Sequence, residues 1–304
     1  MAYGFHIRQL LSTAALLMKE PRSPAPIRNR VRLLPTVLGF VVALCAVSAV
    51  YPQDESTRIY GPEDQAVPTP EFVGTIGEQD ASALQEITNY RTAVNAAAWT
   101  GLQATGTLTD ILGNTDQATL TILGSDNYRL DVTTPIGQRS TRISGPSGAS
   151  LGDDGKTFYM PPITARGGLV AFPLLLVSTF PDPTATIVDR GHVQLDGRLL
   201  QRITLEEEVF PTQSAPSSND LSVTDLYFDP SSHLLIKSAS FVQIDSANRA
   251  RYLIVVTYGD YQAFSGVLVP LSLTETMNGQ IQWTLQLNAP SAPPASVDSS
   301  YFDF

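Results

Sequence analysis

The chain has little of several residue types that would identify a function. One cysteine in 304 residues excludes a disulfide framework and a cysteine-based zinc site. Charged residues make up only 16%, and 21 glycines with 22 prolines are too many for long charged helices or a coiled coil. Acidic residues outnumber basic ones by 29 to 19, which argues against a nucleic-acid-binding protein. The 43% of hydrophobic residues is an ordinary globular content and is sufficient for a sizeable core.

The motifs of common enzymes are also missing. His192 and His233 do not lie at metal-ligand spacing from another histidine or from a cysteine. The segment Gly145–Ala149 comes close to the Gly-x-Ser-x-Gly nucleophile elbow but ends in alanine. Gly155-Lys156-Thr157 lacks the upstream glycine of a phosphate-binding loop, because residue 150 is serine. We therefore predict a protein that is not an enzyme, with no catalytic residue, no metal and no cofactor.

The N-terminus is typical of a secretory signal peptide. An uncharged apolar run at residues 33–50 follows the basic stretch 28–32 and ends in the small residues of Val47-Ser48-Ala49. We predict residues 1–49 as the signal peptide, with Met18 as an alternative to Met1 for the start. The competing interpretation is an uncleaved inner-membrane anchor formed by residues 33–50, because eighteen apolar residues are just long enough to span a bilayer.

Cleavage after residue 49 makes the remaining chain more acidic. It removes six of the basic residues and one of the acidic residues, which leaves 13 and 28 and a net charge of −15. An acidic exported domain without cysteine fits the periplasm or the cell exterior, and anionic lipid surfaces would repel it. We expect a monomer whose membrane contact is transient or runs through an uncleaved N-terminal segment.

Residues 50–78 and 79–304 differ in composition. The first stretch is polar and rich in proline, which predicts a flexible linker. In the second, Asp80 is a candidate N-cap, and apolar residues at spacings of three and four predict a helix of about five turns that Gly101 ends. The apolar residues of that stripe are Ala83, Leu84, Ile87, Tyr90, Val94, Ala97 and Ala98.

From Gly101 onward the hydrophobic period changes to two. Leu120 and Ile122 alternate with polar residues, as do Leu130 and its neighbours and, near the C-terminus, Trp283 and its neighbours. This pattern is typical of half-buried antiparallel strands, and about eleven can be counted. We predict an α+β fold with a strongly curved antiparallel sheet, a half-closed β-barrel, covered by helices; an ordinary β-sandwich is the alternative.

The segment from Leu169 to Phe180 breaks the alternation. It is too apolar for a solvated loop, and we expect it to be covered by protein or by ligand. Arg129, which alternation places beside Asp131, and Arg142 allow two interpretations: ion pairs on the solvated face of a sheet, or guanidinium groups that hold the head group of a ligand.

The order of these features resembles the periplasmic outer-membrane lipoprotein carrier superfamily, the LolA/LolB-like proteins. The resemblance rests on an exported chain, the helix at 81–98, the strand pair at 118–123 and 128–135, the segment Tyr258–Pro270 and the C-terminal Tyr301-Phe-Asp-Phe304. It covers roughly residues 80–304 and is nearest to uncharacterised exported bacterial proteins of this pattern. It implies an unclosed β-barrel with an apolar cavity for acyl chains.

The resemblance also implies where a ligand would lie. The apolar segment becomes a lid over the open side of the barrel, and Arg129 and Arg142 become candidates for head-group contacts. The expected cavity and lid residues are Leu120, Ile122, Leu130, Leu169, Phe172, Leu174, Leu175, Phe180 and Trp283.

The sequence favours a periplasmic or secreted binding protein for an apolar ligand. A lipid, or the acyl chains of a lipoprotein, would be the partner, and nucleic acid would not. A structural or interaction domain of the cell envelope with a filled core is the first alternative, and an unrecognised hydrolase is the second.

Overall fold

The computed structural model describes residues 66–73, 77–124, 126–145, 147–160, 185–208, 221–243 and 251–303. They form one antiparallel sheet of thirteen strands, where about eleven were expected, together with one α-helix and two short 3-10 helices. The residues predicted as signal peptide lie outside this description.

The helices are α3 (Ala81–Ala93), η2 (Ala96–Ala98) and η3 (Ser299–Phe302). The strands are β1 (Gly101–Asp110), β2 (Thr115–Leu123), β3 (Asn127–Thr134), β4 (Gly137–Ser144), β5 (Ser147–Leu151), β6 (Thr157–Met160), β7 (Thr186–Leu195), β8 (Arg198–Glu208), β9 (Leu221–Phe228), β10 (Leu235–Gln243), β11 (Arg251–Phe264), β12 (Val267–Met277) and β13 (Gln280–Leu287).

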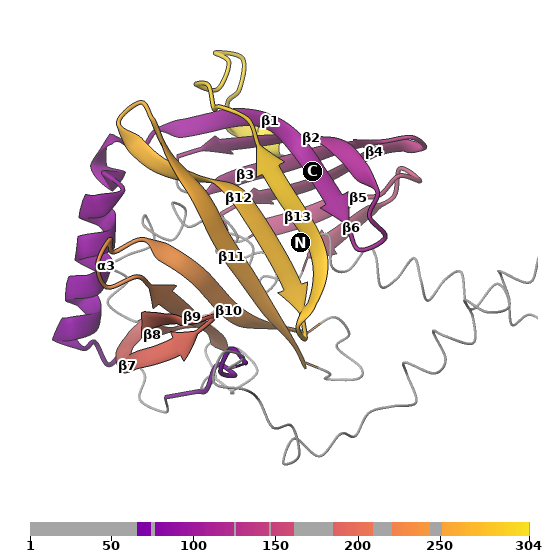
Figure 1. The fold of residues 1–304 in the computed structure, drawn as a ribbon. Helices are drawn as coiled ribbons and strands as arrows, with labels where there is room; N and C mark the ends of the chain where they lie inside the picture. The colour runs from indigo at the N-terminus through magenta and orange to yellow at the C-terminus, as the bar shows by residue number, and fades with distance from the viewer. Residues whose placement is uncertain are drawn as a thin grey trace, which may run out of the picture.

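The sheet consists of two meanders, β1 to β6 and β7 to β13, which the pairing of β1 with β13 joins into one. Its strand order is β6-β5-β4-β3-β2-β1-β13-β12-β11-β10-β9-β8-β7, so β1 pairs with β13 while β6 and β7 are the two outermost strands. Figure 1 shows a strongly curved sheet in which β11 to β13 run across the view in front of β2 to β5, with α3 at one side. The sheet is therefore antiparallel and open, as predicted. Among the described residues a single α-helix accompanies it, so a cover of several helices is not confirmed there.

One hydrophobic core lies on the inner face of this curved sheet. Cross-strand partners share a face, and the pairs Leu120–Leu130 and Ile122–Tyr128 show how the alternating apolar residues of neighbouring strands meet there. The same core takes side chains from α3 and from β1 to β4 and β7 to β13. The register of the sheet thus produces a continuous apolar inner surface.

Helix α3 packs its apolar stripe against that surface. Ala83, Ile87, Tyr90 and Val94 are buried, which confirms this part of the predicted stripe, whereas Leu84 is half-buried and Ala97 and Ala98 are exposed. The helix is shorter than predicted: it ends at Ala93, because Asn95 adopts a left-handed conformation with φ of 54°, and residues 96–98 form a separate 3-10 turn.

Asp80 precedes α3 as predicted, but its side chain does not cap the helix. The carboxylate instead accepts a hydrogen bond from the backbone N–H of Asp189 at 3.0 Å, and the Asp80 N–H donates to the carbonyl oxygen of Ile187 at 2.8 Å. Asp80 therefore attaches the start of the helix to β7.

Residues 66–73, which lie within the predicted linker at 50–78, contact the sheet. Their carbonyl groups accept hydrogen bonds from Arg202 (at Thr69, 3.2 Å) and Arg190 (at Glu71, 3.2 Å). Val67 packs on a second apolar cluster, on the outer face, made of Leu195, Leu200, Tyr227, Ala239 and Val255. This stretch is thus bound to the outer face of the sheet. Its polar, proline-rich composition alone suggested a free chain, because the residues that bind it lie more than a hundred positions away in the sequence.

The burial of Trp283 allows a test of which side chains of β13 face the inner side of the sheet. Its side chain is buried in the main core, as the alternation predicted, whereas Ile281 on the same strand is 55% exposed. We expect Trp283→Ala to lower the free energy of unfolding by about 3–5 kcal/mol, because a large buried side chain is removed, and Ile281→Ala to lower it by less than about 1 kcal/mol. Urea unfolding of both variants measures this, and equal small effects would contradict the register.

Candidate functional site

The inner face of the sheet is the candidate ligand site. Four of the residues predicted to line a cavity meet there: Leu120 and Ile122 on β2, Leu130 on β3 and Trp283 on β13 are all buried in the same core. They come from both halves of the chain, and the pairing of β1 with β13 brings these halves together. The inner face therefore has the apolar character that the sequence predicted.

The residues of the predicted lid lie outside the described residues. The segment 161–184, which contains all of them, joins β6 to β7 along the chain, so it connects the two outermost strands of the sheet. The predicted lid residues concerned are Leu169, Phe172, Leu174, Leu175 and Phe180. Their role stays a prediction.

The inner face also contains a buried carboxylate that the sequence analysis did not single out. Glu275 on β12 pairs with Trp283 on one side and with Val256 on the other, both inward-facing core residues, and it is only 2% exposed. The signal was present in the sequence, because Leu271, Leu273 and Glu275 follow the two-residue period of an inward face.

Buried tyrosines surround Glu275. Burial and, after it, the charge of Glu275 raise the pKa of Tyr128 on β3. Burial also raises the pKa of Tyr258 on β11; a hydrogen bond with Ser238 opposes this rise, and the charge of Glu275 adds to it. The Tyr258 hydroxyl lies 2.7 Å from the Ser238 hydroxyl. These groups form a polar cluster within an otherwise apolar surface.

Tyr90 extends this cluster to the helix. Its ring lies 5.5 Å from that of Phe228 between ring centroids, and the residue is 3% exposed. Its pKa is raised, mainly by burial and then by Tyr258. The Tyr90 hydroxyl is buried and has no hydrogen-bond partner among the described residues, which is unusual for a buried polar group.

A separate cluster of charged side chains lies at the end of the strands where the β1–β2, β3–β4 and β5–β6 turns are. A guanidinium nitrogen of Arg139 donates to Asp116 at 3.0 Å, and its Nε lies 3.8 Å from Asp153. Thr134 donates a further hydrogen bond to Asp153 at 2.9 Å. Arg139 thus offsets part of the negative charge of the two aspartates.

The two arginines predicted to hold a head group lie elsewhere. Arg129 and Arg142 are directly opposite each other on β3 and β4, on the face opposite to the inward-facing pair Tyr128 and Ile143. Arg129 donates to Asp131 at 2.8 Å, which is the ion pair of the alternative interpretation. The contact of these arginines with the head group of a ligand stays a prediction.

Both arginines hold the C-terminal segment instead. Arg129 donates to the carbonyl oxygen of Tyr301 at 2.9 Å and stacks over its ring at 4.1 Å, while Arg142 donates to the carbonyl oxygen of Asp303 at 2.7 Å. Burial and then the neighbouring charge of Arg129 lower the pKa of Arg142. Phe302 between these contacts is fully buried. No sequence signal links residues so far apart in the chain.

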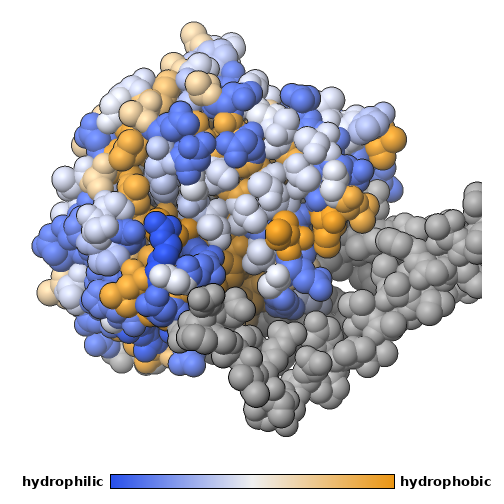
Figure 2. Space-filling model, in the orientation of Figure 1, coloured by the Kyte–Doolittle hydropathy of each residue, from blue (hydrophilic) through white to orange (hydrophobic). Residues whose placement is uncertain are grey.

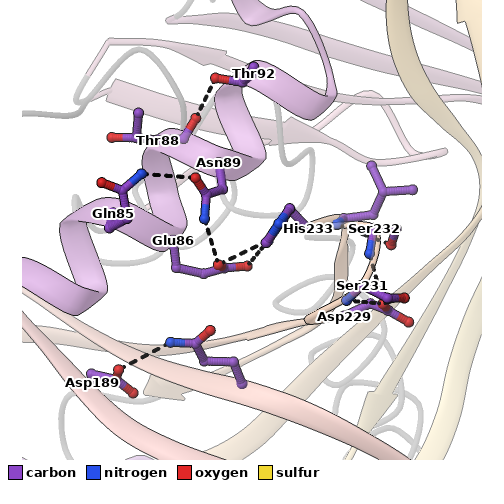
Figure 3. A network of polar contacts seen from close by, with 12 residues as sticks. Gln85, Glu86, Thr88, Asn89, Thr92, Asp189, Asp229, Ser231, Ser232 and His233 are labelled. Atoms are coloured by element: carbon purple, nitrogen blue, oxygen red, sulfur yellow. Dashed lines mark hydrogen bonds and ion pairs between the residues drawn. The ribbon is translucent and has the colours of Figure 1, made fainter.

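His233 connects the β9–β10 turn to helix α3. Figure 3 shows its ring beside the carboxylate of Glu86, with Nδ1 3.0 Å from both carboxylate oxygens. Asn89 donates to the same carboxylate at 3.3 Å and accepts from Gln85 at 2.9 Å. Glu86 is 4% exposed, so this contact gives a buried carboxylate hydrogen-bonding partners.

Asp229 shapes the turn that presents His233. It accepts hydrogen bonds from Ser231 and Ser232, which lower its pKa to about 2. In the described residues the bonded side-chain partners of His233 are the carboxylate oxygens of Glu86, and no serine hydroxyl bonds to it. This arrangement is structural and does not resemble a nucleophile activated by a base.

Exposed hydrophobic residues occur at several places on the described surface. Figure 2 shows hydrophilic side chains over most of the visible face, with hydrophobic side chains in scattered groups. The exposed large hydrophobic residues are Phe72, Ile111, Leu112, Ile136, Tyr159, Leu199 and Ile281. Over the same residues, no cluster of three potential metal ligands and no helix long and apolar enough to cross a membrane is found.

No protein-family model and no curated protein matches the chain. Solved structures similar to it include a LolA superfamily protein from Nitrosomonas europaea (8% identity, 71% of this chain and 97% of that one, TM-score 0.44). Others are a putative outer membrane lipoprotein-sorting protein domain from Vibrio parahaemolyticus (11%, 73% and 97%, 0.48) and the lipoprotein LppX from Mycobacterium tuberculosis (14%, 72% and 100%, 0.27). They are of the kind that the sequence resemblance indicated, and at these identities and TM-scores they support no argument about the ligand of this chain.

Phe302 tests the attachment of the C-terminal segment. We expect Phe302→Ala to lower the free energy of unfolding by about 3–5 kcal/mol, because the ring is fully buried. The exposed Ser299→Ala in the same segment is the control and should change it by less than about 0.5 kcal/mol. Chemical unfolding measures both, and a Phe302→Ala protein as stable as the control would show that the segment is not held.

The contact between Glu86 and His233 can be measured by a double-mutant cycle. We expect Glu86→Gln and His233→Ala to show a coupling energy of about 0.5–3 kcal/mol, since the two side chains are in direct contact. A cycle between Glu86→Gln and the distant exposed Leu112→Ala should give a coupling near zero. Stability curves of the single and double variants provide the measurement, and independent effects of Glu86 and His233 would contradict the contact.

Proposed function

We propose that this protein is a non-enzymatic binding protein that shelters an apolar ligand, a lipid or the acyl chains of a lipoprotein, inside its curved sheet. In this proposal residues 1–49 are a cleaved signal peptide and the domain acts in the periplasm or outside the cell. The observation that carries the proposal is the continuous apolar inner face of a sheet whose outermost strands, β6 and β7, do not pair with each other in the described structure.

The physical reason is the shape of such a sheet. A strongly curved sheet that stays open has an inner surface larger than one short helix covers, and α3 contributes only a single apolar stripe. A hydrocarbon chain that enters this interior gains about 0.8 kcal/mol for each buried methylene group. Leu120, Ile122, Leu130 and Trp283 are the proposed wall, and the apolar segment 169–180 is the proposed cover.

The alternatives differ in what fills the interior. In a structural envelope domain the same residues pack against one another and leave no volume for a ligand. A hydrolase needs a nucleophile beside a base, and the described surroundings of His233 offer the carboxylate of Glu86 in place of a serine hydroxyl.

Lipid extraction tests the proposal directly. The domain is produced with its own signal sequence in a bacterial host, purified from the soluble envelope fraction and extracted for mass spectrometry. We expect lipid in near-stoichiometric amount, and the delipidated domain should bind a fluorescent monoacylglycerol. N-terminal sequencing in the same preparation should give Val50. A domain without lipid that also fails to bind the probe would favour the structural alternative.

A volume-filling variant separates a ligand site from a filled core. Ala118 is 3% exposed on the inner face of β2, and Thr119 is its neighbour on the other face. With a ligand site, Ala118→Phe should reduce probe binding at least tenfold while the domain remains folded. With a filled core, it should cost about 1–3 kcal/mol of stability, since overpacking strains a dense interior. Thr119→Phe is the control and should leave probe binding unchanged.

A further inference from the structure

The inner face contains a buried hydroxyl that has no hydrogen-bond partner among the described residues. This hydroxyl belongs to Tyr90 and is buried between helix α3 and the sheet, whereas the hydroxyls of two nearby tyrosines are bonded. The Tyr258 hydroxyl lies 2.7 Å from that of Ser238, and the Tyr261 hydroxyl donates to the carbonyl oxygen of Leu235 at 2.8 Å. Leaving a buried hydroxyl without a partner is unfavourable, so its presence calls for a partner that the described chain does not supply.

The surroundings of Tyr90 define the electrostatic character of this place. Burial raises the pKa of Tyr90, Tyr128 and Tyr258; Tyr258 adds to the rise at Tyr90, and Glu275 adds to it at Tyr128 and Tyr258. Glu275 is 2% exposed and lies on β12 two residues from Leu273, the cross-strand partner of Tyr258. The polar cluster of the inner face therefore runs from α3 through β11 to β12 and has the character of a carboxylate among phenols.

The Tyr90 hydroxyl and the Glu275 carboxylate together favour some lipid head groups over others. A phenol hydroxyl such as that of Tyr90 donates a hydrogen bond to a carbonyl, ester or alcohol oxygen. A fatty acid would bring a second carboxylate toward Glu275, and like charges in a weakly polar interior repel strongly. Arg129 and Arg142, the cations that the sequence offered for an anionic head group, are on the other face and hold the C-terminal segment.

We infer that the ligand is an uncharged lipid with an oxygen-bearing head group, such as an acylglycerol or a long-chain alcohol or ester, and that the Tyr90 hydroxyl donates a hydrogen bond to this oxygen. The inference rests on the proposed function and specifies the chemical class of its ligand. Ser238, Tyr258 and Glu275 form the remaining polar wall of this subsite, and the apolar wall takes the chain.

The test compares two probes of equal chain length, a fluorescent monoacylglycerol and a fluorescent fatty acid, on the delipidated domain. The wild type should bind the monoacylglycerol at least tenfold more tightly than the fatty acid. Tyr90→Phe removes only the hydroxyl, and it should weaken monoacylglycerol binding by about five- to tenfold, the effect of one hydrogen bond, without changing fatty-acid binding. Glu275→Gln should strengthen fatty-acid binding and so reduce the preference.

Tyr261→Phe is the matched control, because this tyrosine also packs against the inner core, where it is partly buried, but its hydroxyl already donates to the carbonyl oxygen of Leu235. It should leave the ratio of the two affinities unchanged. If both probes bind equally well and Tyr90→Phe changes neither affinity, the inference is overturned while the proposed function stands. If neither probe binds the wild type, the proposed function itself fails.

Discussion

The pairing of β1 with β13 is the constraint on which the rest of the structure depends. It joins the first and last strands of the domain over Gly106 to Asp110, and without it the sheet would fall into two separate meanders. Gly106 permits the close approach: a Cβ atom there would lie 2.1 Å from the carbonyl oxygen of Gln286, which no side chain can accept. The β1–β13 ladder thus makes one inner face out of two halves.

This junction also places the polar cluster. Trp283 lies opposite Asp110 on β1 and opposite Glu275 on β12, so the junction and the buried carboxylate share one region of the inner face. The apolar residues of β1 to β4 and those of β11 to β13 meet across it in a single core. A ligand in this interior would contact both halves of the chain, with its polar end near the residues that α3 and β11 supply.

The features that can be predicted from the sequence are those that the alternation of apolar and polar residues within a strand determines. A period of two assigned Leu120, Leu130 and Trp283 to one face, and their burial confirms it. The same period contained Glu275, but a carboxylate in an apolar row gives no indication of what stands around it. Alternation also placed Arg129 beside Asp131, but the end of α3 and the contact of Arg129 with Tyr301 were not predictable in this way, because contacts with residues distant in the sequence decide them.

The two sides of the sheet have different roles in the proposed function. On the outer face, arginines donate to backbone carbonyl groups of the terminal segments: Arg190 and Arg202 hold residues 66–73, and Arg129 and Arg142 hold residues 301–303. Guanidinium groups suit this task because they carry several donors in a fixed plane and stay charged. These four positive charges therefore contact the terminal segments of the chain itself. On the inner face, burial and, after it, Glu275 raise the pKa of Tyr128 and of Tyr258, and the proposed uncharged ligand would enter this face without placing a second charge beside that carboxylate.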